Sequence, residues 1–312
     1  MEPHRVGIAG AGRSGQEIAQ ILLATVPQVV LYDLNANALD EALQYIENAL
    51  YGIVQSGRLT DWVKEKQLKN IRITTQLEEL ARCDLIIEAV PEQEEIKAEL
   101  FEALDELCDK QTVFASNTSS LSITRLAAVT ERPERFIGLH FIRTPPRPTQ
   151  TGDQEQRLVE IVRGWKTSDD TFARAKRFIE QLGMIPLAAQ DSPGFLVNRI
   201  LVPMINEAVT ALAEGVGTVE MIDQAMTVGA ACSIGPLAMA DWIGLDVCLD
   251  VMEVLFSEFG DMKYRPAPLL RKYVDANFLG RKTDRGFYTY PASPPVSASP
   301  TLRNANNRSE RF

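Results

Sequence analysis

The sequence predicts an α/β fold class in which an N-terminal doubly wound sheet is followed by an all-α C-terminal domain. Short apolar runs alternate with longer amphipathic segments as far as residue 190, and almost only helical periodicity follows. The 312 residues suffice for two domains that each bury a core. We therefore expect domains at 1–190 and 191–290, and a disordered tail at 291–312, which is rich in Pro, Ser, Asn and Arg.

The strands of the first domain are predicted from short apolar or β-branched runs bounded by turn or polar residues. They fall at 6–9, 29–32, 71–74, 85–89, 113–115, 136–139, 158–162 and 185–187. Helical patterns separate most of them, at 14–24, 36–55, 93–107, 123–129 and 169–182. Since strands joined through helices of this length run parallel, we expect a parallel sheet with helices on both faces.

The second domain is predicted to begin at the turn cluster Asp191-Ser192-Pro193-Gly194. Beyond it the apolar residues recur with helical spacing. The expected helices fall at 195–214, 219–228, 236–259 and 267–276.

Charge and composition exclude several classes of protein. With 32 basic and 42 acidic residues the net charge is −10, which disfavours nucleic-acid and anionic-membrane partners. No apolar run is long enough to span a membrane, and no targeting segment is expected. The four cysteines are far apart without CxxC spacing, so we expect a reduced, cytoplasmic compartment and no metal site. Only His4 and His140 could move protons through an imidazole.

A glycine-rich loop follows the first predicted strand and precedes a predicted helix. Gly10, Gly12 and Gly15 match G-x-G-x-x-G, and Asp33 ends the second predicted strand, where an acid can bind the ribose of a dinucleotide. The alternative is a structural glycine turn. Because a carboxylate at Asp33 would repel a 2′-phosphate, NAD is favoured over NADP, while FAD remains an alternative.

A histidine and a glutamate are the candidates for proton chemistry. His140 ends one predicted strand, and Glu160 is a lone acid within the apolar run 158–162. A buried carboxylate needs a partner, and a Glu–His pair would orient a general base. The alternatives are a structural ion pair and a solvent-facing glutamate. The polar stretch 115–122 either contributes to a ligand site at the sheet edge or caps the next helix.

Several segments, taken in order, resemble the L-3-hydroxyacyl-CoA dehydrogenase family, which includes bacterial 3-hydroxybutyryl-CoA dehydrogenases. The glycine loop and Asp33 are part of this similarity, which covers about residues 4–290. The other matching segments are 85–92 with Lys97, 115–121, 138–141, 158–160, 191–199, 234–246 and 280–288.

The resemblance implies an NAD-dependent oxidation of an L-3-hydroxyacyl-CoA, of short chain, by a Rossmann-type domain and a helical domain that forms a homodimer. It implies that His140 is the general base and that Glu160 orients it. Ser119 and Asn198 would bind the substrate oxygen. Glu92 and Lys97 would lie near the nicotinamide half of NAD.

The sequence departs from the family at two places that concern the substrate. Arg143 stands where the family usually has an asparagine, in a longer loop after His140. It could make His140 a readier neutral base, recognise a carboxylate or phosphate, or face solvent. Arg58 is a single cation where the family has several lysines for CoA phosphates. The alternatives are therefore a dehydrogenase of a free or carrier-bound hydroxy acid, similar to those for gulonate or carnitine, and an inactive nucleotide-binding homologue.

Overall fold

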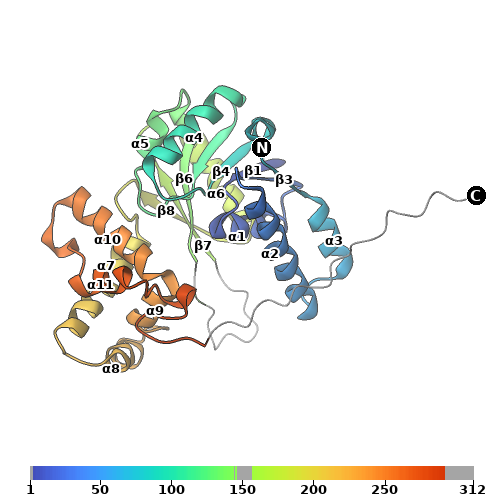
Figure 1. Ribbon diagram of the computed structural model, residues 1–312. Coiled ribbons are helices and arrows are strands. Elements are labelled where there is room, and N and C mark those ends of the chain that lie inside the picture. Colours follow the sequence, from blue (N-terminus) through green and yellow to red (C-terminus); the bar gives the residue numbers. More distant parts are fainter. Residues whose placement is uncertain (1–2, 144, 146–156, 292–312) are drawn as a thin grey trace, which may run out of the picture.

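The computed structural model describes residues 3–143, 145 and 157–291, which form an eight-stranded sheet covered by helices and a helical region beside it (Figure 1). This arrangement confirms the predicted fold class. The strands are β1 (Arg5–Ala9), β2 (Gln28–Tyr32), β3 (Ile71–Thr74), β4 (Leu85–Glu88), β5 (Val113–Ser116), β6 (Phe136–Phe141), β7 (Leu158–Arg163) and β8 (Ile185–Gln190).

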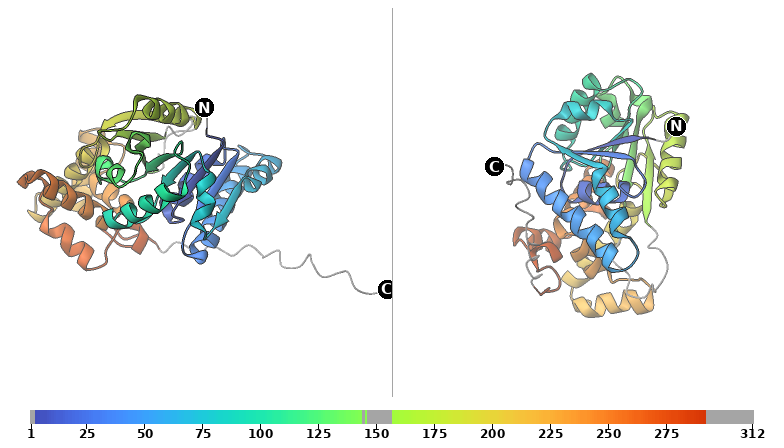
Figure 2. Two further views of the ribbon diagram at one scale, coloured as in Figure 1. Left: turned by 90° about the horizontal axis from the view of Figure 1, so that it is seen from above. Right: turned by 90° about the vertical axis from the view of Figure 1, so that its right-hand side faces the viewer.

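The helices around the sheet and in the helical region account for most of the remaining described residues. Those of the sheet region are α1 (Arg13–Leu22), α2 (Ala36–Gln55), α3 (Asp61–Lys69), α4 (Glu94–Leu107), α5 (Ile123–Ala128) and α6 (Asp169–Gln181). Those of the helical region are α7 (Val197–Ala213), α8 (Val219–Gln224), α9 (Pro236–Ile243), α10 (Leu245–Phe259) and α11 (Pro268–Asp275). The helical region lies beside the sheet region in every view (Figures 1 and 2).

The strand order is β3-β2-β1-β4-β5-β6-β7-β8, so the order reverses between β1 and β4. Ligands of doubly wound sheets bind outside the carboxyl ends of the strands at such a reversal. Every neighbouring pair is parallel except β6 and β7, which are antiparallel. A parallel sheet was predicted from the sequence. The step from β6 to β7 differs because no helix is predicted between 139 and 158, and a parallel connection needs such a crossover.

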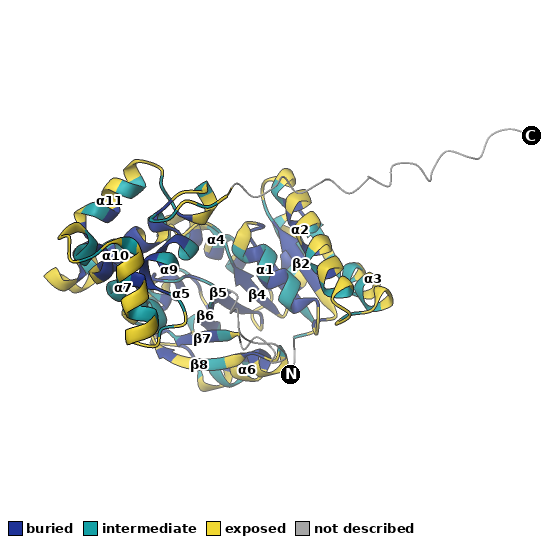
Figure 3. Cartoon of the chain, turned by 90° about the horizontal axis from the view of Figure 1, so that it is seen from below, coloured by how far each residue is buried: buried dark blue, intermediate teal, exposed yellow. Residues whose placement is uncertain are grey.

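Two apolar layers cover the two faces of the sheet. On one face, side chains of α1, α2 and α6, such as Ile18, Ile46 and Phe178, pack on the strands. On the other face, α4 and α5 contribute Phe101 and Leu126. Strands β4, β5 and β6 are buried along their whole length (Figure 3), which explains why their sequences are continuous apolar runs.

The helical region has a core of its own, and its helices differ from the predicted ones at two points. The helix predicted at 236–259 is two helices, because Gly244 has φ +110° and ends α9 before α10 begins. The helix predicted at 195–214 begins only at Val197, since Phe195 has φ +48°. Helix α3 was not predicted, because it has no fully buried residue and therefore a weak apolar pattern.

The chain beyond Pro291 and most of the segment between β6 and β7 fall outside the described residues. The disordered tail predicted at 291–312 therefore lies almost wholly in the part that the structure does not describe. Among the described residues, no helix has the length and apolar character required to cross a bilayer.

Candidate active site

The glycine loop lies between β1 and α1, at the carboxyl end of the sheet. Gly10 has φ +112°, and a Cβ there would clash with the backbone of Ala89. A Cβ at Gly15 would clash with the carbonyl oxygen of Gly10, so α1 can approach the loop only with glycine at this position. A Cβ at Gly12 would meet nothing within 4 Å, which leaves the backbone open to a ligand. A dinucleotide pyrophosphate fits this combination of close packing and open backbone.

Asp33 follows β2 and faces the same loop. Its Oδ2 accepts a hydrogen bond of 2.8 Å from the backbone N–H of Ala11, and its Oδ1 accepts one of 2.9 Å from Asn35. Each carboxylate oxygen keeps a further acceptor site. The carboxylate is therefore held beside the glycine loop and can accept hydrogen bonds from ribose hydroxyls.

His140 and Glu160 form a pair across the antiparallel strands β6 and β7. They are directly opposite in the register, so both side chains project from the same face. The Nδ1 atom of His140 lies 2.7 Å from Oε2 of Glu160. Because an ionised carboxylate can only accept hydrogen bonds, Nδ1 carries the proton and Nε2 of a neutral ring keeps its lone pair. This is the tautomer that a general base needs.

The beginning of α7 stabilises the charge of Glu160, which is fully buried. The backbone N–H groups of Leu196 and Val197 each donate a hydrogen bond of 2.9 Å to Oε1 of Glu160. Burial opposes ionisation of this carboxyl. The hydrogen bonds from His140, Val197 and Leu196 outweigh it, so the pKa of Glu160 is lowered. The pair therefore ties the sheet to the helical region.

Phe195 packs against this pair. Its ring centroid lies 5.9 Å from that of His140, and the side chain is 4% exposed. Its positive φ lets the chain turn into α7 so that the first N–H groups of that helix point at Glu160. The contact between the two rings means that Phe195 helps to hold the imidazole of His140 in place.

The buried carboxylate leads to a pH-dependent prediction for stability. A lowered pKa means that ionised Glu160 stabilises the folded state above its ordinary pKa of 4.5, and that this contribution disappears as the pH falls through the lowered value. Glu160→Gln should therefore lower the free energy of unfolding by about 1–3 kcal/mol at pH 7. Urea unfolding of both proteins over a pH series should show the difference shrinking in acid. A difference independent of pH would contradict the prediction.

A cluster of three charged residues lies at the end of β4, just after it and on α4, and two of them, Glu88 and Lys97, are buried. The Nζ atom of Lys97 lies 2.6 Å from Oε1 of Glu88 and 3.1 Å from Oε2 of Glu92. Burial by itself would lower the pKa of Lys97, but the two carboxylates outweigh it and the pKa is raised. For Glu92, burial opposes ionisation, while Lys97, Thr118 and Ser119 together lower the pKa. Lys97 and Glu92 are therefore both charged at neutral pH.

Ser119 and Asn198 meet between the sheet and the helical region. Ser119 donates through its backbone N–H and its hydroxyl to Oε1 of Glu92, at 2.8 and 3.2 Å. The amide of Asn198, on α7, donates to the carbonyl oxygen of Ser119 at 3.4 Å.

Ser119 and Asn198 both line a cavity of about 410 Å³ together with His140, Glu92 and Lys97. Leu201, Met239, Ile243 and Val247 of the helical region form its apolar wall. The cavity suits a small substrate with a short apolar chain and one polar oxygen.

Arg143 and Arg58 have different positions relative to this cavity. Arg143 lines it, and its Nε lies 2.8 Å from Oε2 of Glu17, with the side chain 30% exposed. Arg58 is exposed in the turn after α2, where its Nε donates to Ser56. The structure thus brings Arg143 to the other candidate residues and leaves Arg58 apart from them.

Three residues of the site were not predicted as site residues from the sequence. Glu88 is completely buried against Lys97 and Ser116, Asn117 accepts a hydrogen bond from the backbone of Phe141, and Phe195 packs on His140. An acid at the end of a fully apolar run was the available signal for Glu88. Asn117 lies in the polar stretch 115–122 that was predicted as a possible ligand site, but its contact with Phe141 was not predicted. Nothing in the local pattern distinguishes Phe195, because its partner is distant in the sequence.

These features define a class. A doubly wound sheet with an open glycine loop, an acid beside that loop and an oriented histidine beside an apolar cavity is typical of dinucleotide-dependent oxidoreductases. The family described as "3-hydroxyacyl-CoA dehydrogenase, NAD binding domain" matches residues 5–192, and that described as "3-hydroxyacyl-CoA dehydrogenase, C-terminal domain" matches residues 194–290.

Individual relatives agree with this match. The chain is 47% identical over 292 residues to 3-hydroxybutyryl-CoA dehydrogenase of Bradyrhizobium diazoefficiens, covering 94% of this chain and 97% of that protein. It is 43% identical over 286 residues to the enzyme of that name from Clostridioides difficile, covering 92% and 99%. The crystal structure of (S)-3-hydroxybutyryl-CoA dehydrogenase from Ralstonia eutropha superposes with a TM-score of 0.85 at 43% identity, covering 93% and 100%. The chain belongs to the 3-hydroxyacyl-CoA dehydrogenase family and is an NAD-dependent oxidoreductase.

Proposed function

We propose that this enzyme oxidises the 3-hydroxyl of a short-chain L-3-hydroxyacyl-CoA, such as 3-hydroxybutyryl-CoA, to the 3-ketoacyl-CoA, with His140 as the general base. The observation that carries the proposal is the hydrogen bond between Nδ1 of His140 and Glu160. It supports an imidazole whose Nε2 is available to a substrate in the adjoining cavity.

NAD would be held by the loop of Gly10, Gly12 and Gly15 and by Asp33, with Glu92 and Lys97 near its nicotinamide half. When bound, NAD supplies the acceptor for the hydride that leaves the carbinol carbon. The charged pair of Lys97 and Glu92 would also keep the loop of Ser119 in place.

The side chains of the cavity have different roles in the reaction. Nε2 of His140 takes the proton of the substrate hydroxyl, and Glu160 stabilises the resulting imidazolium. When substrate binds, the hydroxyl of Ser119 would exchange its hydrogen bond to Glu92 for one to the substrate oxygen, and the amide of Asn198 would donate a second as that oxygen becomes a ketone. Ser119 comes from the sheet region and Asn198 from α7 of the helical region. Closure of the helical region onto the sheet region would therefore exclude water from the reaction.

The assembly and compartment of the enzyme belong to the same proposal. We propose that residues 191–290 are a separate helical domain through which the enzyme forms a homodimer. Exposed apolar side chains there, such as Ile200 and Met221, support this assignment. The four cysteines are free thiols, which supports a reducing, cytoplasmic compartment.

The direct test is turnover by the purified protein. We expect NADH to form from L-3-hydroxybutyryl-CoA and NAD, and not from the D isomer. The absorbance of NADH measures the reaction. NADP should be a poorer cofactor because Asp33 would repel its 2′-phosphate. Turnover of only the free hydroxy acid, or of no hydroxyacyl compound, would contradict the proposal.

A further inference from the structure

Two buried aspartates of the helical region play no part in the proposed reaction. Asp223 lies on α8 and is 7% exposed, and Asp241 lies on α9 and is 1% exposed. Burial raises the pKa of Asp241, and the hydrogen bonds that it accepts offset only part of this effect. A buried carboxylate costs free energy unless its oxygens are hydrogen-bonded. The partners of the two aspartates therefore show which parts of the chain they hold together.

The carboxylate of Asp241 holds the segment from Gly286 to Tyr290 against α9. Its Oδ1 accepts a hydrogen bond of 2.9 Å from the backbone N–H of Phe287. Its Oδ2 accepts two more of 2.9 Å, from the backbone N–H of Tyr288 and from the hydroxyl of Tyr290. A Cβ at Gly286 would overlap this carboxylate, so the segment can approach Asp241 this closely only with glycine at that position.

Asp223 connects the same segment to the beginning of α9. Its Oδ1 accepts a hydrogen bond of 2.8 Å from the backbone N–H of Leu237. Its Oδ2 accepts two of 2.9 Å, from the backbone N–H of Ala238 and from the hydroxyl of Tyr288. A buried polar network with all its carboxylate oxygens bonded fixes the groups that it joins. We call the four residues of this network the aspartate clamp: Asp223, Asp241, Tyr288 and Tyr290.

Helix α9 separates the aspartate clamp from the cavity that contains His140. Met239, Trp242 and Ile243 of this helix line the cavity. They are three and four residues apart and therefore share one face of the helix, whereas Asp241 lies on the opposite face. No residue of the clamp is among those that the structure shows lining the cavity. The clamp therefore holds the apolar wall of the cavity from behind.

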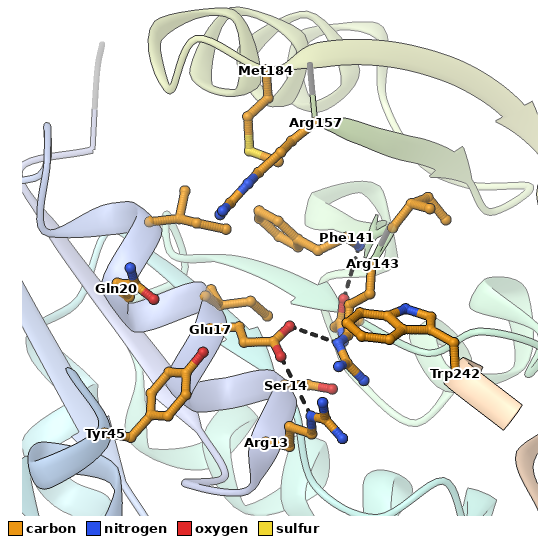
Figure 4. A pocket seen from close by; sticks show the side chains of 14 residues that line it. Arg13, Ser14, Glu17, Gln20, Tyr45, Phe141, Arg143, Arg157, Met184 and Trp242 are labelled. Atoms are coloured by element: carbon orange, nitrogen blue, oxygen red, sulfur yellow. Dashed lines mark hydrogen bonds and ion pairs between the residues drawn. The ribbon is translucent and has the colours of Figure 1, made fainter. Parts of the chain in front are cut away.

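A stacked arginine connects the aspartate clamp to the indole of Trp242. The guanidinium carbon of Arg281 lies 5.0 Å from the ring centroid of Tyr290 and 5.3 Å from that of Trp242. The same indole lies beside Arg143 of the sheet region (Figure 4), with 5.9 Å between its ring centroid and that guanidinium carbon. Trp242 therefore spans the boundary between the two regions, and its position depends on the segment that Asp241 holds.

We propose that Asp241 is a positioning residue that sets the depth of the substrate cavity, because through the aspartate clamp it fixes α9, which presents Met239 and Ile243 to the acyl chain. The inference rests on the proposed function and adds to it the origin of the preference for a short chain. A fixed wall packs closely on an acyl chain of one length. A wall that is free to move admits longer chains and packs less closely on the short one.

The test measures kcat and KM of the wild type and of two variants with L-3-hydroxybutyryl-, L-3-hydroxyhexanoyl- and L-3-hydroxyoctanoyl-CoA. In Asp241→Asn an NH2 group replaces one acceptor oxygen, so the clamp loses hydrogen bonds from the segment after Gly286. We expect KM for the four-carbon substrate to rise about 10-fold while kcat changes less than about threefold, since His140 and Glu160 lie on other elements. The ratio of kcat/KM for the eight-carbon substrate to that for the four-carbon substrate should rise about 10-fold. Tyr290→Phe removes a single hydroxyl and should shift this ratio in the same direction by a smaller factor.

A merely structural role would lower stability without changing the preference for chain length. Asn206→Ala is the matched control, because Asn206 is also buried in the helical region and is not among the described residues that line the cavity. Its amide donates to the carbonyl oxygen of Arg265 at 3.2 Å and accepts from the N–H of Ala267 at 2.8 Å. The control should lower the unfolding temperature and leave the ratio unchanged. An equal change of ratio in Asn206→Ala, or an unchanged ratio in Tyr290→Phe and folded Asp241→Asn, would overturn the proposal.

A double-variant cycle tests whether Asp241 acts through the wall. In Ile243→Ala the wall already has room for a longer chain, so adding Asp241→Asn should change the ratio further by less than about threefold. Additive effects of the two substitutions would mean that Asp241 acts elsewhere, and would refute its role in setting the wall.

Binding separates failure of this inference from failure of the proposed function. Butyryl-, hexanoyl- and octanoyl-CoA have no 3-hydroxyl group, so their calorimetric titration requires no turnover. Asp241→Asn should shift the relative affinity about 10-fold towards octanoyl-CoA. This shift in a protein that reduces no NAD would refute the proposed function and keep the positioning role. Turnover of L-3-hydroxybutyryl-CoA with no such shift would do the reverse.

Discussion

Replacing His140 by alanine should lower kcat for oxidation of L-3-hydroxybutyryl-CoA by about 10²- to 10⁴-fold, the usual contribution of a general base. The variant removes the only imidazole that lines the cavity among the described residues. Binding of NADH, measured by fluorescence, should change little, because the glycine loop and Asp33 lie on other strands. Steady-state rates over a pH series measure the effect, and added imidazole should restore part of the rate.

The matched control is His4→Ala. His4 is exposed before β1, and its backbone N–H rather than its ring contacts Asp84. Its loss should leave kcat unchanged. Full turnover by His140→Ala, or an equal loss in both variants, would refute the assignment of the base.

Replacing Lys97 by methionine should lower the free energy of unfolding by about 3–5 kcal/mol, the usual cost of removing one partner of a buried ion pair. Lys97 is 1% exposed and lies between Glu88, which is completely buried, and Glu92. Without the ammonium group, the buried carboxylate of Glu88 loses its cationic partner while the carboxylate of Glu92 remains nearby. Urea unfolding at neutral pH measures the loss. The loss should shrink in acid, since protonation removes the uncompensated charge.

Glu88→Gln is the matched control for that variant. It leaves Lys97 paired with Glu92 and should cost less, about 1–2 kcal/mol, from weaker hydrogen bonds to Lys97 and Ser116. The double variant should be more stable than Lys97→Met alone. Equal losses for the two single variants would mean that packing rather than charge accounts for the effect.

Most of the fold could be predicted because the central strands of the sheet are buried on both faces. Each strand then reads as a short apolar run, and the helices between them keep a clear apolar stripe. The prediction of secondary structure failed where the spacing of apolar residues does not show where a helix lies or ends. Helix α3 has no fully buried residue, and the break at Gly244 falls within a continuous helical periodicity. The antiparallel step from β6 to β7 was missed because an apolar run carries no information on strand direction.

The candidate site was predictable to the extent that its residues follow strands. Gly10, Asp33, Ser119 and His140 each come at or just after the carboxyl end of a strand, and a parallel sheet brings such ends together. The partners of Glu88 and the packing of Phe195 were not predictable, because these contacts join residues 28 positions apart for Glu88 and Ser116 and 55 for Phe195 and His140.

Thus the composition and motifs alone indicate an acidic two-domain dehydrogenase with two histidines, of which one follows a strand beside a candidate acid. The register of β6 and β7 makes His140 and Glu160 partners, and the start of α7 supplies the two N–H groups that keep Glu160 charged. Only the tertiary structure brings Arg143 to Glu17, whose Oε2 lies 2.8 Å from its Nε. The physical reason is that periodicity and turn chemistry are local, whereas dehydration and pairing of charges depend on groups from distant parts of the chain.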